Sequence, residues 1–490
     1  MQSSDQFDVV VVGGGNAGFS AAHAAAERGR RVLLLEKGSP REPGGNSYYT
    51  AGAFRIAHDG LAELAGLVEA DERHGISVLT PYTARDFTAD MRKVTGGRND
   101  SALTEALVGD SQDTLRWLHG KGLRFRLMYE RQAYPDAQDR EVFWGGLAVG
   151  STGGGKGLIE QHTRAAHDAG VEIRHGARAR RLVVDGGAVT GLEWTDDLGN
   201  TGSLRADSVV LAAGGFEADP ELRGEHLGAE WRRAKVRGTP HNTGDMLVAA
   251  LDAGAAAHGD WNTCHSVAWD AWHPENEGNR ELTNQLTRGG YPLGIVVNER
   301  GERFLDEGAD SRNLTYAKYG AKILEQPEGL AFQIFDATTR PQLRAEEYDM
   351  PGASVVVADS LEELAEGSGV DGPALKSTVA DFNASIDRSA PLDIAALDQR
   401  AAPVSPPKSN WAVPVETPPY YAFPVTCWIT FTFGGLRVDT RGRVLAESGE
   451  SVPGLLVCGE MLGGLFSGNY PGGTGLTSGA VFGRRAGSLA

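Results

Sequence analysis

The sequence has few cysteines and no cysteine motif. Its 490 residues include only Cys264, Cys427 and Cys458, which lie far apart in apolar surroundings. The spacing C-x-x-C does not occur, which excludes a zinc knuckle, an iron–sulfur cradle and a haem attachment site of that type. We therefore expect three buried, structural thiols and no bound metal.

The sequence also lacks an excess of basic charge and a long apolar run. It has 47 Lys and Arg against 65 Asp and Glu, a net charge of −18. Phosphates would be repelled by this charge, which argues against a nucleic-acid partner. No segment approaches the ~18 consecutive apolar residues of a membrane span, so we expect no integral membrane contact. An apolar run begins as early as Val9, leaving no room for a signal peptide, and we expect a cytoplasmic location.

What the chain does have is a glycine-rich N-terminal unit. Residues 8–12 are an aspartate followed by four apolar, β-branched valines, which predicts a buried parallel strand, and residues 19–28 predict a helix. Between them, Gly13 allows a tight turn, Gly15 lets a pyrophosphate approach the backbone, and Gly18 lets the helix pack against the strand. This order of strand, turn and helix predicts a dinucleotide site.

An acidic residue completes the N-terminal unit. Residues 32–35 predict a second strand, and Glu36 follows it directly. A carboxylate at this distance from the glycines can accept a hydrogen bond from a ribose hydroxyl. The unit therefore favours a dinucleotide with an unphosphorylated adenosine ribose.

The end of the chain has the pattern of a partner to this unit. Residues 455–457 predict a strand, and a glycine-rich segment, residues 463–487, follows it. This arrangement would return the C-terminus to the first sheet. We expect a discontinuous dinucleotide-binding domain, residues 1–256 and 425–490, with a cap inserted at residues 257–424. The proline-rich residues 403–424 are expected to be a crossing linker.

Seven motifs resemble, in order, those of the succinate dehydrogenase/fumarate reductase flavoproteins, and together they cover essentially the whole chain. They are residues 11–18, 44–47, 212–216, 243–245, 301–304, 457–460 and the C-terminal glycine-rich segment. Residues 459–480 resemble most specifically the FAD-dependent tricarballylate dehydrogenases, which desaturate a tricarboxylate to cis-aconitate. The resemblance implies an α/β fold: a Rossmann-like FAD-binding domain of the glutathione reductase type with an inserted α+β cap.

The resemblance implies FAD as the cofactor, with Glu36 on its ribose and the backbone of Ala179 near the adenosine. It places Gly459, Glu460 and residues 476–477 along the ribityl chain and the pyrimidine edge. The cofactor-binding residues expected in this way are Gly13, Gly15, Asn16, Ala17, Gly18, Glu36, Lys37, Gly44, Gly45, Asn46, Ser47, Ala51, Gly52, Ala179, Ala213, Gly214, Gly215, Asp245, Gly459, Glu460, Gly475, Leu476 and Thr477.

In family members with covalently attached FAD, the attaching residue is a histidine in the Asn-Ser loop. Here Tyr48 or Tyr49 stands in that place. We therefore expect non-covalent FAD.

Two arginines of the cap match a proton relay of fumarate reductases. Arg312 follows the turn at residues 301–304, as does the arginine that delivers or removes the substrate proton, and Arg288 would match a second arginine of the relay. A guanidinium is almost always charged, so Arg312 is a better proton donor or carboxylate clamp than a free base and needs a relay partner. Alternatively, Arg312 pairs with Asp306 or Asp310 at the surface.

Two carboxylate-binding groups of fumarate reductases are absent. Phe431 stands where those enzymes have a histidine, and Tyr470 stands where they have an arginine. Succinate and fumarate are therefore disfavoured. The tricarballylate group shares the Asn-Tyr-Pro-Gly-Gly form of residues 469–473, whereas in 3-ketosteroid dehydrogenases a comparable tyrosine helps to polarise a carbonyl. Tyr470 could also serve only in packing, and His265 could bind a carboxylate or be a core histidine.

We predict an FAD-dependent dehydrogenase that desaturates a CH–CH bond next to a carboxylate, with tricarballylate or a related polycarboxylic acid as substrate. Its partners would be a small anionic substrate and a separate electron acceptor or O₂. The alternatives are a desaturase of a ketone or of a biosynthetic acid, a fumarate reductase-type enzyme and a non-catalytic nucleotide-binding protein. The expected catalytic residues are Arg312, Tyr470 and Arg288, and His265 and Gly473 join them as substrate-binding residues.

Overall fold

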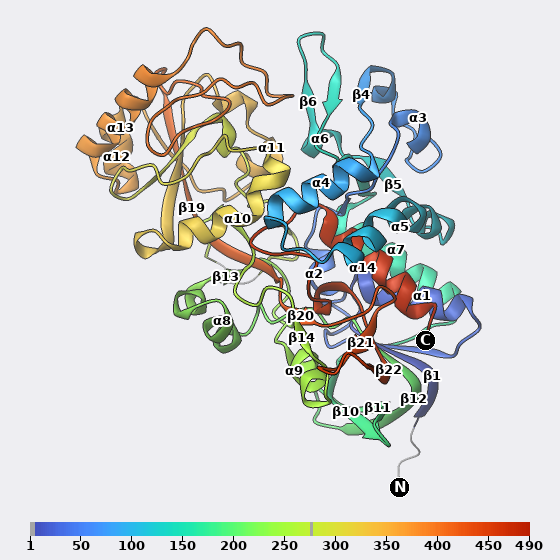
Figure 1. The fold of residues 1–490 in the computed structure, drawn as a ribbon. Coiled ribbons are helices and arrows are strands. Elements are labelled where there is room, and N and C mark those ends of the chain that lie inside the picture. Colours follow the sequence, from blue (N-terminus) through green and yellow to red (C-terminus); the bar gives the residue numbers. More distant parts are fainter. Residues whose placement is uncertain (1–4, 275–277) are drawn as a thin grey trace.

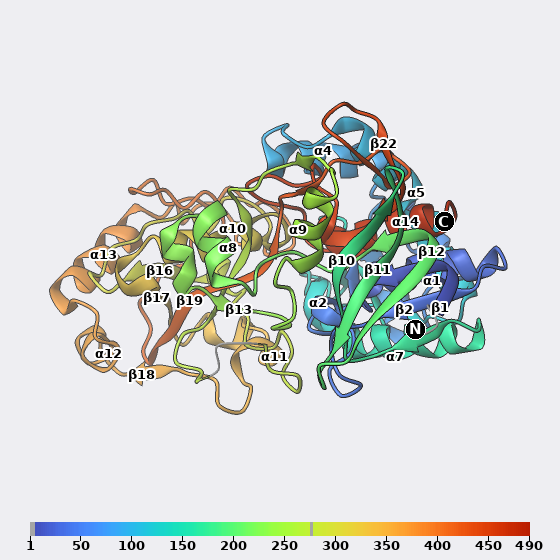
Figure 2. The same cartoon turned by 90° about the horizontal axis from the view of Figure 1, so that it is seen from below.

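The computed structural model describes residues 5–274 and 278–490. The chain forms two lobes, one built mainly from its two ends and one from its middle (Figures 1 and 2). No helix in the described part of the chain is both long and apolar enough to span a membrane.

The first lobe is organised around a parallel sheet. Strand β1 (Asp5–Val12) pairs in parallel with β2 (Val32–Leu35) on one side and with β12 (Thr201–Leu211) on the other. The sheet is extended by β9 (Glu172–Arg174) beyond β2 and by β22 (Ser451–Val457) beyond β12. The predicted strands of the dinucleotide unit and the predicted return of the C-terminal strand are confirmed.

An antiparallel extension grows from the first half of β12. It is formed by β10 (Ala177–Asp185) and β11 (Ala188–Asp196), while β21 (Arg443–Leu445) pairs with β22. The other strands and helices of this lobe are α2 (Gly45–Tyr48), β3 (Ala53–Phe54), α3 (Leu61–Leu64), β4 (Ser77–Leu79), α4 (Ala84–Thr95), β5 (Phe125–Leu127), α6 (Tyr129–Gln132), β6 (Ala133–Pro135), β7 (Glu141–Phe143), β8 (Val149–Ser151), α8 (Pro220–His226), α9 (Asp245–Asp252), β14 (Ala257–His258) and β20 (Gly435–Leu436).

Helices α1 (Asn16–Glu27) and α14 (Thr474–Gly487) lie against each other beside this sheet, with α5 (Ser101–Gly120) and α7 (Gly154–Asp168) next to them (Figure 1). Helix α1 begins three residues before the predicted start because Gly15, in an extended conformation, is its N-cap. The dinucleotide helix therefore begins within the glycine motif itself.

A row of glycines allows the contact between α1 and α14. A Cβ on Gly483 would lie 2.4 Å from the carbonyl oxygen of Ala17, and one on Gly487 would lie 2.1 Å from that of Ala21. Gly479 is one turn earlier on the same face. The two backbones therefore approach more closely than any larger side chain would permit.

The second lobe is the cap, which is built on a mixed sheet. Its longest strand is β19 (Tyr420–Thr432), flanked by β13 (Lys235–Val236), β15 (Cys264–Asp270), β17 (Leu330–Phe335) and β18 (Val356–Ala358). The remaining cap elements are β16 (Ile295–Asn298), which pairs with β17, and α10 (Arg312–Leu324), α11 (Ala345–Tyr348), α12 (Leu361–Ser368) and α13 (Gly372–Ser385).

Strand β19 lies across the expected cap boundary. Residues 420–424, expected to belong to a linker, are paired with β17 and β18, so that part of the linker prediction is wrong. The strand continues without a break through residue 425 to Thr432, and most of its residues are buried, as expected of a central strand that pairs on both sides. Residues 403–419 contain no helix or strand.

The three cysteines are buried and form no disulfide, as predicted. Burial raises the pKa of the Cys427 and Cys458 thiols to about 12. Such thiols are inert at neutral pH.

The α1–α14 contact generates a stability prediction. Gly483→Ala places a methyl group against the Ala17 carbonyl and should lower the free energy of unfolding by about 1–3 kcal/mol. Gly109→Ala is the matched control, because Gly109 is exposed within α5 with no atom near its potential Cβ. This control should be neutral or stabilise the protein by about 0.5–1 kcal/mol. Urea denaturation of both variants would test the idea, and equal effects would contradict it.

Candidate active site

One cavity runs from the N-terminal glycine motif to the cap. It is lined by the loop around Gly13, the N-termini of α1 and α14, the residues around Asn46, and cap residues that include Arg312 and Tyr316. The cavity therefore joins the predicted cofactor residues to the predicted proton-transfer residue.

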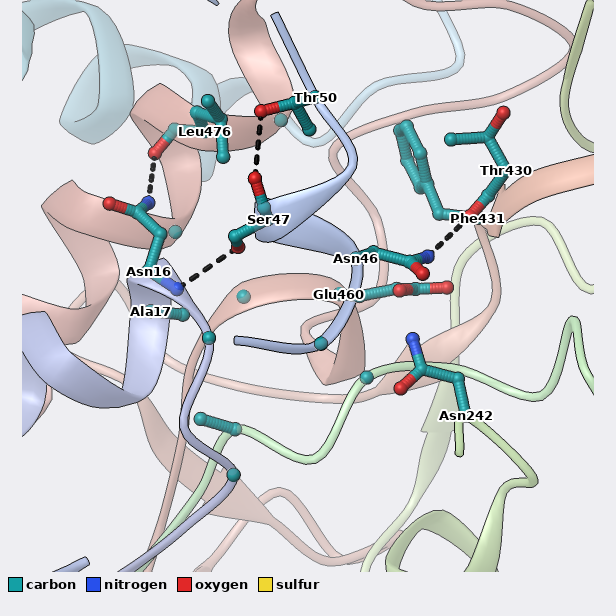
Figure 3. A pocket seen from close by; sticks show the side chains of 18 of the residues that line it. Asn16, Ala17, Asn46, Ser47, Thr50, Asn242, Thr430, Phe431, Glu460 and Leu476 are labelled. Carbon is teal, nitrogen blue, oxygen red and sulfur yellow. Dashed lines mark hydrogen bonds between the residues drawn. The ribbon is translucent and has the colours of Figure 1, made fainter. Parts of the chain in front are cut away.

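Asn16 is the structural centre of the cofactor end (Figure 3). Its backbone N–H donates to Ser47 Oγ at 3.0 Å, and its Nδ2 donates to the Leu476 carbonyl at 2.8 Å. Asn16 thus ties the glycine motif to the Asn-Ser loop and to α14.

Two buried histidines fix the orientation of the Asn16 amide. His162 Nε2 lies 3.1 Å from Asn16 Oδ1, and His23 Nε2 lies 3.1 Å from His162 Nδ1. Because Asn16 Nδ2 is already a donor, its Oδ1 must accept, so both histidines carry their proton on Nε2. Burial lowers the pKa of His23 to about 4 and that of His162 well below its usual value. Both rings are neutral near pH 7.

The adenosine end is held by charged groups. Both oxygens of Glu36 accept backbone N–H groups, from Gly14 at 2.7 Å and from Gly38 at 2.6 Å, which orients the carboxylate at the cavity wall. Nearby, Asp245 bonds to both Lys37 and Arg178. Burial would raise the pKa of Asp245, but these two cations hold it below its usual value. Lys37 and Asp245 therefore brace each other while lining the cavity.

Two neighbouring carboxyl groups, those of buried Glu217 and of half-buried Glu460 on the cavity wall, lie beside the Asn46 loop. Glu217 Oε1 accepts from the side-chain amides of Asn46 and Asn242, and Glu460 Oε1 accepts from the backbone and hydroxyl of Thr432. Burial raises the pKa of both carboxyls, that of Glu460 furthest because Glu217 is its neighbour. The pair therefore holds a shared proton at neutral pH.

Most of the expected cofactor residues line the cavity, and five lie behind its wall. The five are Gly18, Gly44, Gly52, Gly215 and Thr477. The glycines among them shape the wall: a Cβ on Gly18 would lie 1.8 Å from the Gly13 carbonyl oxygen, and one on Gly215 would lie 2.1 Å from Glu460 Oε1. Thr477 Oγ1 donates to the Arg55 carbonyl.

The cavity fits a dinucleotide. Helices α1 and α14 both direct N-termini without a side-chain cap towards it, so their free N–H groups and dipoles favour anionic groups and carbonyls of a ligand. The Glu36 carboxylate is available to a ribose. Bound FAD would be held by these residues.

At the cap end, Arg312 is buried and paired. It is the first residue of α10, its Nη1 donates to Glu347 Oε1 at 2.9 Å, and its Nη2 donates to the Arg131 carbonyl at 2.8 Å. Arg131 also lies 3.2 Å from Glu347 Oε1. Although burial opposes both charges, the ion pair raises the pKa of Arg312 and lowers that of Glu347. Neither expected surface partner, Asp306 nor Asp310, forms an ion pair with Arg312 among the described residues.

Arg288 and His265 are fully buried and do not line the cavity. Arg288 Nη2 donates to Asp270 at 2.7 Å, and Arg288 also bonds to the Glu347 carbonyl oxygen. The His265 ring lies against Tyr470 at a centroid distance of 4.8 Å, and burial lowers its pKa well below the usual value. The structure therefore places both residues behind groups that do face the cavity.

Two tyrosines meet at the cap end. Tyr316 lies one turn after Arg312 on α10, and its hydroxyl bonds to that of Tyr470. The loop carrying Tyr470 is docked on α10, because Asn469 Nδ2 donates to the Leu314 carbonyl and the Gly472 N–H donates to the Asn313 carbonyl. Gly473, expected to bind substrate, also lines the cavity.

Sequence reasoning missed four residues of this end: Arg131, Arg237, Tyr316 and Glu347. Tyr316 could have been found, because it is four residues after Arg312, a spacing that places two residues on one face of a helix. The other three come from short elements or loops far from Arg312 in sequence, with no motif to single them out.

The Glu217–Glu460 pair generates a prediction about pH. Because both folded-state pKa values are raised, the folded protein binds a proton that the unfolded chain releases, and this stability is lost as the pH rises above about 4.5. Glu217→Gln supplies a permanent donor in place of that proton. We expect its thermal midpoint to fall less than that of the natural protein between about pH 6 and about pH 9. Glu447→Gln, at an exposed glutamate, is the control, and parallel curves for all three proteins would contradict the shared proton.

Comparison with known proteins agrees with this geometry. Residues 8–476 match a family model described as FAD binding domain. The chain is 29% identical over 499 residues to the fumarate reductase (cytochrome) of Shewanella frigidimarina, covering 99% of this chain and 77% of that protein. It is 28% identical over 506 residues to the urocanate reductase of Eggerthella lenta, covering 99% and 74%.

Solved structures show the same fold. The 3-ketosteroid delta1-dehydrogenase from Sterolibacterium denitrificans superimposes with a TM-score of 0.73 at 22% identity, covering 99% of each chain. The family match spans nearly the whole chain and includes the residues that form the cofactor end of the cavity. The chain therefore belongs to the FAD binding domain family, among the fumarate reductase/succinate dehydrogenase flavoproteins, and is an FAD-dependent oxidoreductase acting on carbon–carbon bonds.

Proposed function

We propose that this enzyme desaturates a CH–CH bond next to a carboxylate, with tricarballylate or a related polycarboxylic acid as its substrate. The observation that carries the proposal is Arg312, a buried guanidinium on the cavity wall with a buried carboxylate behind it. When bound, FAD supplies the hydride acceptor. The chain's own residues have to bind the acid, acidify its α-hydrogen and remove a proton.

Arg312 and Arg131 are the groups that would bind the carboxylate next to the reacting bond. Both guanidinium groups line the cavity, and a charge-assisted bond from a guanidinium orients a carboxylate as well as attracting it. Drawing electron density into the carboxylate makes the neighbouring C–H bond more acidic. Binding of the carboxylate by the two guanidinium groups would therefore accelerate removal of the α-proton.

Proton removal requires a relay, because a charged guanidinium is not a base. Arg312 can take the α-proton only as it passes one of its own protons from Nη1 to Glu347 Oε1, 2.9 Å away. The proton would continue towards solvent through Arg131, whose Nη1 bonds to the partly exposed Glu346 at 2.6 Å. Arg288, which bonds to the Glu347 carbonyl oxygen and pairs with Asp270, would position this carboxylate.

FAD is proposed to be held without a covalent bond. Residues 44–52 contain neither histidine nor cysteine. The Arg280 guanidinium lies over the ring of Tyr48, 3.5 Å from the centroid of that ring, and Tyr49 is buried.

The Tyr316–Tyr470 pair favours a second candidate, a desaturase of a ketone. A phenol held by a second phenol can donate to a carbonyl oxygen, and Phe431 and Phe466 line the cavity beside them. Burial raises the pKa of both phenols, so they remain neutral donors at neutral pH. A neutral ketone would not pair with the positive charge around Arg131, whereas a carboxylic acid substrate would, and this favours the acid as substrate.

Anaerobic bleaching of the FAD absorbance tests the proposal directly. We expect bleaching by tricarballylate, and we expect none by succinate or by a 3-ketosteroid. Arg312→Ala should retain FAD, and its rate of bleaching should fall by at least about 100-fold. The variant lacks both the guanidinium that binds the substrate carboxylate and the first proton acceptor. Bleaching by the ketone alone would favour the second candidate, and unchanged turnover in Arg312→Ala would remove its catalytic role.

Adjacent glutamates test the relay. Glu347→Gln keeps the shape of the side chain but can neither accept a proton nor balance Arg312, so kcat should fall by about 100-fold or more while KM does not rise. Glu346→Gln is the matched control, because Glu346 pairs with Arg131 and is partly exposed, so that water can accept the proton in its place. Its kcat should stay within about twofold. Equal losses in the two variants would show that charge around Arg131, rather than proton transfer through Glu347, is what matters.

A further inference from the structure

Arg237 is a buried cation at the cap end of the cavity. The residue is 9% exposed, and its Nε donates to Thr430 Oγ1 at 2.9 Å. Within residues 5–274 and 278–490, no carboxylate forms an ion pair with it. Its terminal nitrogens make no hydrogen bond to the described chain and are not enclosed by protein, so they face the cavity that Arg237 lines.

The other buried arginines of this region have partners. Arg312 and Arg131 share the Glu347 carboxylate, and Arg288 pairs with Asp270. Arg237 instead has a like charge, Arg131, in its surroundings. Burial lowers the pKa of Arg237 and the charge of Arg131 acts in the same direction, while the hydroxyls of Tyr316 and Tyr470 oppose them.

A buried guanidinium with no counter-charge strongly destabilises a folded protein. Such a group persists when a ligand of opposite charge binds it in the working state. The pyrophosphate of the cofactor is not that ligand, because its expected site at Asn16 and Ser47 is formed by other elements, and Arg237 bonds to neither residue.

The pairing of β13 with β19 sets the direction of Arg237, which directly follows β13. In the β13–β19 pair, Val236 is opposite Ile429, so the next residues, Arg237 and Thr430, meet where β19 reaches the cavity. The Thr430 carbonyl accepts from Asn46 Nδ2 at 2.6 Å, which anchors this point to the cofactor loop (Figure 3). Thr430 thus holds one edge of the guanidinium and leaves the terminal nitrogens as a fork for a ligand.

We propose that Arg237 is a subsite for a second carboxylate of the substrate, separate from the carboxylate held by Arg312 and Arg131. The identity of this anion as a substrate carboxylate rests on the proposed function. Arg131, Arg237 and Arg312 all line this cavity together with Tyr316, so three cations face one space. Two carboxylate positions around the reacting bond select polycarboxylic acids over monocarboxylic acids and neutral ketones.

The FAD-loaded enzyme tests the subsite by binding as well as by turnover. Tricarballylate and butyrate are titrated while the flavin absorbance and the thermal midpoint are followed. Arg237→Met removes the charge at similar volume, Arg237→Lys keeps the charge without the fork, and Arg232→Gln is the control. Arg232 pairs with Glu221 at the surface and does not line the cavity.

Arg237→Met should weaken tricarballylate binding by at least about 30-fold, because it removes one partner of a buried charge pair. Its ligand-free midpoint should equal or exceed that of the natural protein, and added tricarballylate should no longer raise it. Arg237→Lys should be intermediate and Arg232→Gln unchanged. The natural enzyme should prefer tricarballylate to butyrate, and Arg237→Met should lose much of this preference.

Three results would overturn the subsite. One is unchanged tricarballylate affinity in Arg237→Met. A second is a lower ligand-free midpoint with an intact ligand-induced rise, which would make Arg237 structural. The third is a shifted flavin reduction potential with unchanged affinity, which would make the flavin its partner. Bleaching by tricarballylate in any of these cases leaves the proposed function standing. If the natural enzyme binds neither acid yet is bleached by a ketone, the subsite and the acid substrate both fail, and the oxidation of a CH–CH bond remains.

Discussion

The close approach of α1 and α14 is the constraint on which the site depends. Glycines on α14 bring the last helix of the chain against the first, so that both N-termini open into one cavity. Asn16 then spans the junction by bonding to the Leu476 carbonyl and to Ser47. A larger side chain in the row would separate the helices, and the two halves of the cofactor site would no longer meet. The discontinuous domain is therefore held at the place where it binds its ligand.

Buried charge distinguishes the two ends of the cavity. At the cofactor end, backbone N–H groups hold Glu36, and Lys37 and Arg178 pair with Asp245. The Glu217–Glu460 pair shares a proton. At the cap end, the guanidinium groups of Arg131, Arg237 and Arg312 outnumber the two carboxylates that pair with them, Glu346 and Glu347. The low dielectric of a closed site strengthens each of these interactions. An anionic substrate would complete the charge balance that the chain itself leaves open.

The two lobes meet through the groups that would perform the chemistry. Loop 469–473 belongs to the first lobe but is bonded to the backbone of α10, and its Tyr470 meets Tyr316 of that helix. Arg131 comes from α6 in the first lobe and shares Glu347 of the cap with Arg312. Movement between the lobes would therefore change the contacts of Glu347 with Arg312 and Arg131 together with the phenol pair.

The sequence by itself determined the parallel sheet, the glycine motif, the acid at position 36 and the return of the C-terminus. These features depend on local patterns, namely apolar runs, glycines at fixed spacing and short motifs. Only the tertiary structure decided which groups surround Arg312. Glu347, Arg131 and Arg237 lie on separate elements, and His265 and Arg288 were expected at the substrate but lie behind the wall. Contacts between residues far apart in sequence follow from how the cap sheet and α10 pack, which no local pattern records.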